Sequence, residues 1–187
     1  MPLILASASP RRLALLEQIG ITPARVEPAD IDESVCAREL PRPHALRIAT
    51  EKAQAVAART KGVILAADTV VACGRRILPK AEDDATVTKC LSLLSGRRHT
   101  VLTAVALIDT TGKLRTRIVE TKVAFRRLDA QEIAAYVQTA EGLGKAGGYA
   151  IQGRAAVFAT AIHGSYTNVV GLPLTETFQL LKACGAV

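Results

Sequence analysis

The 187-residue chain has few aromatic side chains, with three Phe, three Tyr and no Trp. Proteins that bind single-stranded nucleic acid stack bases on aromatic side chains, so this supply is small for that role. The chain also lacks a run of about 20 apolar residues, the length that a membrane-spanning helix needs. Its beginning has neither the basic stretch nor the long apolar segment of a secretory signal. We therefore expect a cytoplasmic protein without a membrane segment.

Cysteine and histidine are scarce, and their spacing argues against the common metal motifs. The four cysteines, at positions 36, 73, 90 and 184, form no C-x-x-C pair, and no histidine lies at metal-site spacing. In a reducing compartment such cysteines are best interpreted as small buried apolar side chains. The pattern G-x-x-x-x-G-K-[ST] is also absent, which disfavours a P-loop NTPase.

The charge of the chain is strongly unbalanced. Lys and Arg number 24 against 17 Asp and Glu, which gives a formal net charge of +7. Such a charge favours polyanionic partners, either nucleic acid or phosphorylated small molecules, without telling them apart. The length predicts one domain with a sizeable core, covering residues 1–187.

The stretch Leu3–Arg12 predicts a short buried strand, a tight turn and the start of a helix. Ser9 stands at the N-cap position and a proline follows at the first helical position. Free N–H groups of this helix, the Ser7 hydroxyl and the guanidinium groups of Arg11 and Arg12 would converge on an anion such as phosphate. An ordinary capped helix with a solvated arginine pair is an equally good interpretation of these residues alone.

Helical and strand patterns alternate early in the chain and hairpins dominate later, which indicates a mixed α/β sheet. Expected helices begin near residues 10, 44, 83, 129 and 173, and expected strands cover 3–6, 25–27, 63–72, 100–108, 114–125, 155–162 and 166–170. The last two strands form a hairpin about residues 163–165. Residues 28–43 are expected to be a mobile loop, and Leu174, Phe178 and Leu181 a core-facing stripe on the last helix.

A single carboxylate interrupts the most apolar strand pattern. Residues 63–67 are apolar on both faces, as in a central strand, and the run ends on Asp68 before it resumes at Val70. An ionisable group there is costly unless function or a specific partner retains it. The residues leave two interpretations open: a catalytic carboxylate, or one that accepts backbone N–H bonds from a neighbouring turn.

Five motifs follow one another along nearly the whole chain: A-S-A-S-P-R-R at 6–12, A-A-D-T-V-V at 66–71, L-S-G at 94–96 with His99 behind it, K-A-G-G-Y-A-I-Q-G at 145–153, and G-S-Y at 164–166 leading to V-G-L-P at 170–173. Together they resemble the Maf family of nucleoside triphosphate pyrophosphatases. The resemblance implies an elongated, mixed and partly antiparallel sheet flanked by helices, with two lobes around a central cleft.

The resemblance also implies an activity and a site. The activity is metal-dependent hydrolysis of dTTP, UTP and related or modified pyrimidine nucleotides to the monophosphate and pyrophosphate, with Mg²⁺ or Mn²⁺ as cofactor, and a homodimer belongs to the same expectation. Asp68 would be the general base or a metal-positioning group, and Glu33 would help to hold the metal. The implied substrate-binding residues are Ser7, Arg11, Arg12, Lys52, Lys80 and Gln152.

Two of these assignments leave alternatives open. Glu33 lies close to two other acids, so Asp30 or Asp32 could substitute for it. Lys80 stands in P-K-A at residues 79–81, whereas the family usually has Gly-Lys-Pro, so the direction of its side chain is not fixed by the resemblance.

Base selection is expected at Gln152, because an amide can donate and accept at once and so suits the carbonyl and imide N–H of uracil or thymine. The resemblance places I-Q-G in the dTTP and UTP branch, whereas a glutamate there marks the branch acting on 7-methylguanosine triphosphate. The alternative to an enzyme is a basic binding protein for RNA or a cell-division partner, the role behind the family's description as septum-formation inhibitors. Nucleic acid is the less favoured partner, given the few aromatic residues.

Overall fold

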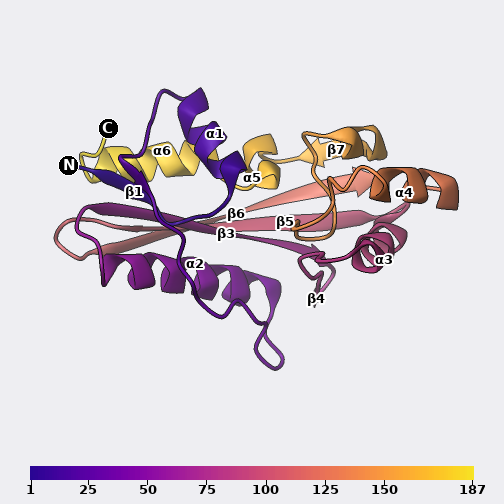
Figure 1. Ribbon diagram of the computed structural model, residues 1–187, viewed down its shortest axis with the longest axis horizontal. Helices are drawn as coiled ribbons and strands as arrows, with labels where there is room; N and C mark the ends of the chain where they lie inside the picture. The colour runs from indigo at the N-terminus through magenta and orange to yellow at the C-terminus, as the bar shows by residue number, and fades with distance from the viewer.

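The computed structural model describes residues 1–187, which form one sheet with helices on both faces (Figure 1). The strands are β1 (Leu3–Leu5), β2 (Arg25–Val26), β3 (Val63–Cys73), β4 (Arg76–Ile77), β5 (Arg98–Ile108), β6 (Leu114–Phe125) and β7 (Ala159–His163). The helices are α1 (Pro10–Gln18), α2 (Pro41–Ala57), α3 (Asp84–Leu94), α4 (Ala130–Val137), α5 (Tyr166–Val170) and α6 (Leu174–Ala183), with a 3₁₀ turn over Arg154–Phe158. None of the helices has both the length and the apolar character needed to cross a bilayer.

The sheet has the strand order β2-β1-β3-β5-β6-β7, and β4 pairs with β3. β1 runs parallel to β2 and β3, whereas antiparallel pairings join β3 to β5, β5 to β6 and β6 to β7. The three long strands β3, β5 and β6 follow the long axis of the molecule in Figure 1. The mixed, elongated and partly antiparallel sheet expected from the sequence is confirmed.

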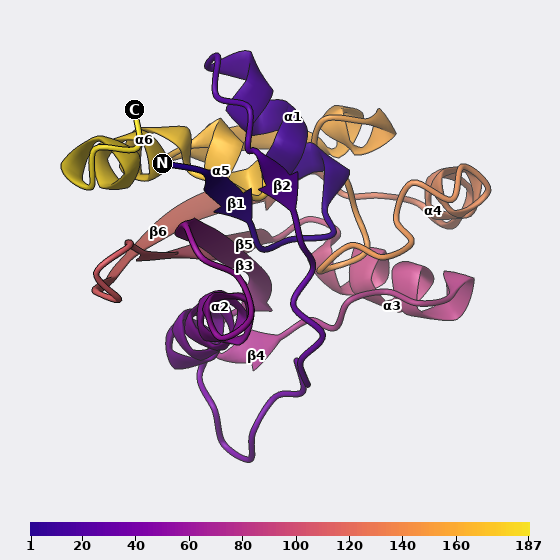
Figure 2. The same cartoon turned by 60° about the vertical axis from the view of Figure 1, so that its left-hand side comes forward.

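Alternate residues of β3 point to opposite faces of the sheet, and each face has its own core. Ile64, Ala66 and Val70 pack in a cluster with residues of α2. Leu65 belongs to the larger cluster on the other face. Figures 1 and 2 show α2 on one side of the sheet and α1, α5 and α6 on the other. Asp68 falls in the even-numbered series, so its side chain is directed to the α2 face.

α2 packs on the sheet through small side chains on both surfaces. The facing alanines, all without exposed area, are Ala45, Ala49, Ala53, Ala66, Ala104 and Ala106. Short side chains let a helix axis approach a sheet closely, because little volume separates the two backbones. This close approach is what lets a lysine of α2 reach the carboxylate of β3.

β3 continues through Asp68, in agreement with the strand expected over 63–72, because its pairing with β5 runs without a break past this residue. One predicted element is wrong. Residues 166–170 form helix α5 instead of the second strand of a hairpin. The Ser165 hydroxyl caps this helix by accepting a hydrogen bond from the backbone N of Asn168 at 3.2 Å, and Gly171 ends it with a φ of 132°.

Two predictions of burial also need correction. Of the four cysteines only Cys90 is buried; Cys36 is exposed and the other two are half-buried. On α6, Leu181 is buried as expected, but Phe178 is 44% exposed. The stripe predicted on this helix therefore does not coincide with its core-facing side, which has Thr177 and Leu180 beside Leu181.

The close approach of α2 gives a test of the fold. Ala49→Leu adds volume between α2 and the sheet, so we expect the free energy of unfolding to fall by about 1–3 kcal/mol, as for other overpacked cores. Urea unfolding measures this change. The matched control Ala58→Leu, at an exposed position directly after α2, should leave stability nearly unchanged; equal effects of the two variants would contradict the packing described.

Candidate active site

A cleft of about 1080 Å³ opens where several elements end or bend. It is bordered by the turn between β1 and α1, by residues 28–35, by the middle of β3, by residues 77–80 and by parts of the glycine-rich segment 144–152. All of the site residues predicted from the sequence line this cleft: Ser7, Arg11, Arg12, Glu33, Lys52, Asp68, Lys80 and Gln152. The fold thus brings together side chains that are far apart in the sequence.

Three charged side chains form a cluster in the cleft. The Nζ atom of Lys52 lies 2.9 Å from Oδ1 of Asp68 and 2.9 Å from Oε1 of Glu33. Lys52 and Asp68 are only 8% and 7% exposed, whereas the Glu33 side chain is 47% exposed. Water screens buried charges little, so the Lys52–Asp68 attraction is the stronger of the two pairs. With both carboxylates ionised the cluster keeps one net negative charge, which a further cation could neutralise.

Of the neighbouring acids, Glu33 is the one that reaches Lys52. Asp32 instead accepts hydrogen bonds from the backbone N and the hydroxyl of Ser34, at 2.9 and 3.0 Å. These bonds lower the pKa of Asp32. Asp30 lines the cleft without an ion pair. The geometry therefore favours Glu33 over the two alternatives that the sequence left open.

Arg12 is held by three oxygens of the protein. Its Nε donates to the carbonyl of Gly171 at 2.8 Å, and its terminal nitrogens donate to the hydroxyls of Ser7 and Thr69, both at 3.1 Å. Burial lowers the pKa of Arg12, and the nearby charge of Asp68 opposes this shift. A guanidinium has five N–H donors, so two remain for a ligand in the cleft.

The turn before α1 differs in one detail from the expected phosphate-binding turn. Ser9 occupies the N-cap position, but its side chain makes no capping bond. Its backbone N donates instead to the Ser7 hydroxyl at 3.2 Å, and Arg12 donates to the same oxygen. A hydroxyl has two acceptor lone pairs and one donor. Because both acceptor sites of Ser7 are used, its O–H remains as a donor for an anion.

The glycine-rich segment fixes the chain around Lys80. Lys80 and Ala146 form an isolated β-bridge, and the backbone N of Ala81 donates to the carbonyl of Lys145 at 3.0 Å. A proline in place of Ala81, as in the usual family pattern, could not donate this bond. The departure P-K-A therefore leaves Lys80 in the cleft and adds a bond to the segment opposite. That segment brings a second lysine, Lys145, into the cleft lining.

A known protein family matches nearly the whole of this chain. Residues 2–184 match the family profile described as "Maf-like protein". The chain belongs to the Maf family. A Caulobacter vibrioides protein named dTTP/UTP pyrophosphatase is 61% identical over 184 residues, 98% of this chain and 95% of that protein. A Rhodospirillum rubrum protein of the same name is 59% identical over 185 residues, 98% of this chain and 88% of that protein.

A solved structure supports the fold alone. A HAM1 protein from Coxiella burnetii has a TM-score of 0.51 and 16% identity, over 98% of this chain and 99% of that one. At this identity the two chains share an architecture, and the similarity carries no information on substrate.

In this Maf-family chain the segment that carries Glu33 is tied to α2. The carboxylate of Glu39 accepts hydrogen bonds from Nε and Nη2 of Arg47, both at 2.7 Å, and lies 2.8 Å from Nδ1 of His44. Arg47 also donates to the carbonyl of Ser34 at 2.9 Å. The hydrogen bonds from Arg47 hold the pKa of Glu39 well below its usual range. Figure 2 shows this segment leaving β2 and turning back to α2. The segment expected to be a mobile loop is therefore anchored to α2 through Glu39 and Ser34.

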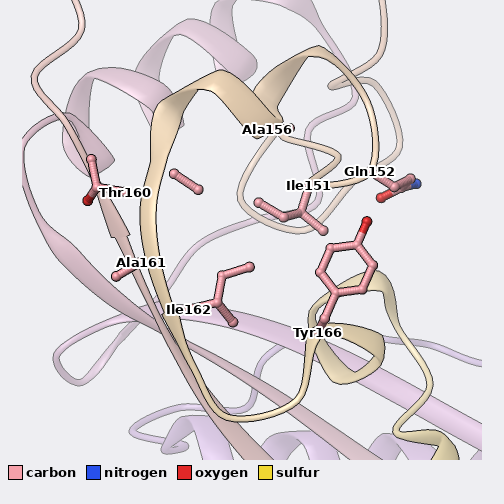
Figure 3. A pocket seen from close by; sticks show the side chains of 8 residues that line it. Ile151, Gln152, Ala156, Thr160, Ala161, Ile162 and Tyr166 are labelled. Carbon is pink, nitrogen blue, oxygen red and sulfur yellow. The ribbon is translucent and has the colours of Figure 1, made fainter.

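Gln152 lies at the rim of the cleft. It is exposed and also lines a neighbouring shallow pocket of about 460 Å³. Figure 3 shows Ile151 and Ile162 beside this pocket, with the hydroxyl of Tyr166 directed toward the Gln152 side chain. Gln152 and Ile151 belong to both cavities, so a ligand in the cleft could extend into the shallow pocket past them.

His99, which follows the third motif, is a core residue. It is 2% exposed, and its Nε2 lies 2.7 Å from the hydroxyl of Tyr149. The Phe125 ring packs against it at a centroid distance of 4.9 Å. Burial lowers the pKa of His99 to about 4, so the ring is neutral at pH 7. These contacts place His99 in the hydrophobic core, away from the cleft lining.

The anchor of the Glu33 segment can be tested by hydrogen exchange. Glu39→Gln removes the charge that pairs with Arg47, and losing a charged hydrogen bond costs about 1.5–3 kcal/mol. We therefore expect amides of residues 33–39 to exchange about tenfold faster or more. The control is Glu51→Gln, which removes only a 3.3 Å contact with Arg47. Unchanged exchange in Glu39→Gln, measured by mass spectrometry, would show that the anchor does not hold the segment.

Proposed function

We propose that this chain hydrolyses nucleoside triphosphates to the monophosphate and pyrophosphate, with dTTP, UTP and related or modified pyrimidine nucleotides as substrates. The observation that carries the proposal is the composition of the cleft. Two carboxylates form ion pairs with Lys52 there, and further cations line the same cleft. Cleavage between the α and β phosphates requires neutralising about four negative charges and holding a water in line with the α phosphorus. The name dTTP/UTP pyrophosphatase, borne by the relatives, supports the same activity.

The carboxylates of Glu33 and Asp68 fit a magnesium or manganese site. They come from different segments, yet one oxygen of each lies 2.9 Å from the same Nζ atom of Lys52. Mg²⁺ prefers one or two carboxylates completed by substrate phosphate oxygens and water. Such an ion, when bound, neutralises phosphate charge and lowers the pKa of a coordinated water.

The remaining roles follow from the contacts of each side chain. Asp68, buried on the α2 face, would accept the proton of the attacking water while Lys52 holds its carboxylate in place. The O–H of Ser7 and the two free N–H groups of Arg12 would donate to phosphate oxygens. The bond that forms joins the water oxygen to the α phosphorus, and the bond that breaks joins that phosphorus to the oxygen of the departing pyrophosphate.

We propose that the whole chain forms one functional domain. Both hydrophobic clusters rest on the same sheet, which supports a single domain over residues 1–187. The alternative, a binding protein without catalysis, does not explain why carboxylates line the cleft together with the cations. A cytoplasmic location stays a prediction of the composition, and a homodimer stays a prediction of the resemblance.

Asp68→Asn tests the catalytic assignment, because it keeps the shape of the side chain and removes only its charge. We expect pyrophosphate release from dTTP with Mg²⁺ to fall by about 10²–10⁴-fold, the usual contribution of a general base, while nucleotide binding persists. Asp84→Asn, at an exposed position in the first turn of α3, is the control. A variant that keeps about a tenth or more of the wild-type rate would remove Asp68 from the mechanism.

Gln152→Glu tests base selection. The change removes an amide donor and sets a negative charge against a base carbonyl, so kcat/KM for dTTP and UTP should fall by about tenfold or more. GTP and 7-methyl-GTP, which lack the uracil edge, should be affected less, and Gln131→Glu, at an exposed position of α4, serves as control. A uniform fall for all four nucleotides, or wild-type preference for 7-methyl-GTP, would show that Gln152 does not set specificity.

A further inference from the structure

The cations of the cleft differ in whether the protein already neutralises them. Lys52 has two carboxylate partners, and Arg12 donates to three oxygens and lies in the field of Asp68. Arg11, Lys80 and Lys145 form no ion pair with any carboxylate of the chain. The cleft therefore has one end where carboxylates pair with the cations and another where Glu82 and Asp83 also line the cleft but no carboxylate lies within ion-pair distance of the cations.

Lys145 is the one of these three that the sequence analysis did not select. Its Nζ donates to the carbonyl of Leu143 at 3.0 Å. An ammonium has three N–H donors, so two remain available. Burial lowers the pKa of Lys145, and the positive charges of Arg11 and Lys80 lower it further. Three cations that repel one another in a shared cavity form a site that an anion would stabilise.

The backbone holds Lys145 firmly at this place. The carbonyl of Lys145 accepts from the backbone N of Ala81 and of Gly148, both at 3.0 Å. Gly147 has a φ of 68°, and a Cβ at this position would lie 2.8 Å from a methyl group of Val71 on β3. Only glycine fits this close approach in a left-handed conformation. The segment is therefore pinned against β3, three residues beyond Asp68, and little ordering remains when a ligand binds.

We propose that Lys145 is a further substrate-binding residue, which acts with Lys80 and Arg11 to hold the β and γ phosphates, and hence the pyrophosphate that leaves. This inference rests on the proposed function. The α phosphate must lie near Asp68, where the reacting water and metal carboxylates are, and Lys52 is already neutralised there. Most of the substrate's negative charge is on the β and γ phosphates. These two phosphates therefore bind the cations that have no ion-pair partner, Arg11, Lys80 and Lys145.

The test compares the two products as ligands. Lys145→Met removes the ammonium and keeps the apolar stem, and Lys145→Arg keeps the charge. Binding of inorganic pyrophosphate and of dTMP is measured by calorimetry, with KM for dTTP in parallel. We expect Lys145→Met to weaken pyrophosphate binding by about tenfold or more and dTMP binding by less than about twofold, as for loss of one charge-assisted contact. Lys145→Arg should recover most of the loss.

The control is Lys182→Met, an exposed lysine in the last turn of α6, which should leave both affinities unchanged. If Lys145→Met binds pyrophosphate as well as the wild type, or loses dTMP and pyrophosphate equally, the inference is overturned while dTTP hydrolysis by the wild type stands. If Lys145→Met does not fold, a folded Lys145→Gln variant takes its place. Equal loss of pyrophosphate binding in Lys145→Gln and Lys145→Arg would then overturn the inference. A wild-type protein that does not hydrolyse dTTP would overturn both this inference and the proposed function.

Discussion

The ammonium group of Lys52 joins three parts of the molecule at one point. Lys52 comes from α2, Asp68 from the middle of β3, and Glu33 from the segment between β2 and α2. A buried ion pair adds little to stability, because the cost of desolvating the charges offsets their attraction. Its value here is positional: the alanine face of α2 and the continuous pairing of β3 both serve to bring these charges together.

The distribution of charge in the cleft favours one orientation of the bound nucleotide. Near Asp68 the positive charge of Lys52 is matched by carboxylates, which suits a metal ion, a water and the singly charged α phosphate. Lys80 and Lys145 have no carboxylate within ion-pair distance and lie close enough to repel each other, which suits the more highly charged end of a triphosphate. A nucleotide bound in the opposite direction would put its most charged end against the carboxylates, at an electrostatic cost.

Sequence patterns predicted those helices and strands whose ends are determined by residues close to them in the sequence. The strand, turn and helix at the N-terminus were predicted correctly from the proline and the apolar run, and the helix expected near residue 129 begins there, with a capping box of Asp129 and Glu132. Helix α5 was missed because its β-branched residues favour a strand, while the cap from Ser165 and the turn at Gly171 decide the outcome.

The site was less accessible to sequence reasoning, because long-range contacts sort residues that look equivalent in the sequence. Three nearby acids were candidates for the proposed metal ligand, and only packing against α2 places Glu33, and not Asp32, beside Lys52. Asp68 was noticed as a carboxylate in an apolar run, but its direction depends on which face α2 covers. Lys145 belongs to one of the five sequence motifs, but its proposed role depends on the proximity of Arg11 and Lys80, which only the fold reveals.

The central claim is that the cleft directs water to the α phosphorus of a pyrimidine nucleoside triphosphate. Hydrolysis of dTTP with Mg²⁺ in ¹⁸O-labelled water, with the products analysed by mass spectrometry, tests this claim most directly. The account predicts dTMP that carries one labelled oxygen, together with unlabelled pyrophosphate, since the water oxygen stays on the phosphorus that it attacks. Formation of dTDP and inorganic phosphate, or label in the pyrophosphate, would contradict it.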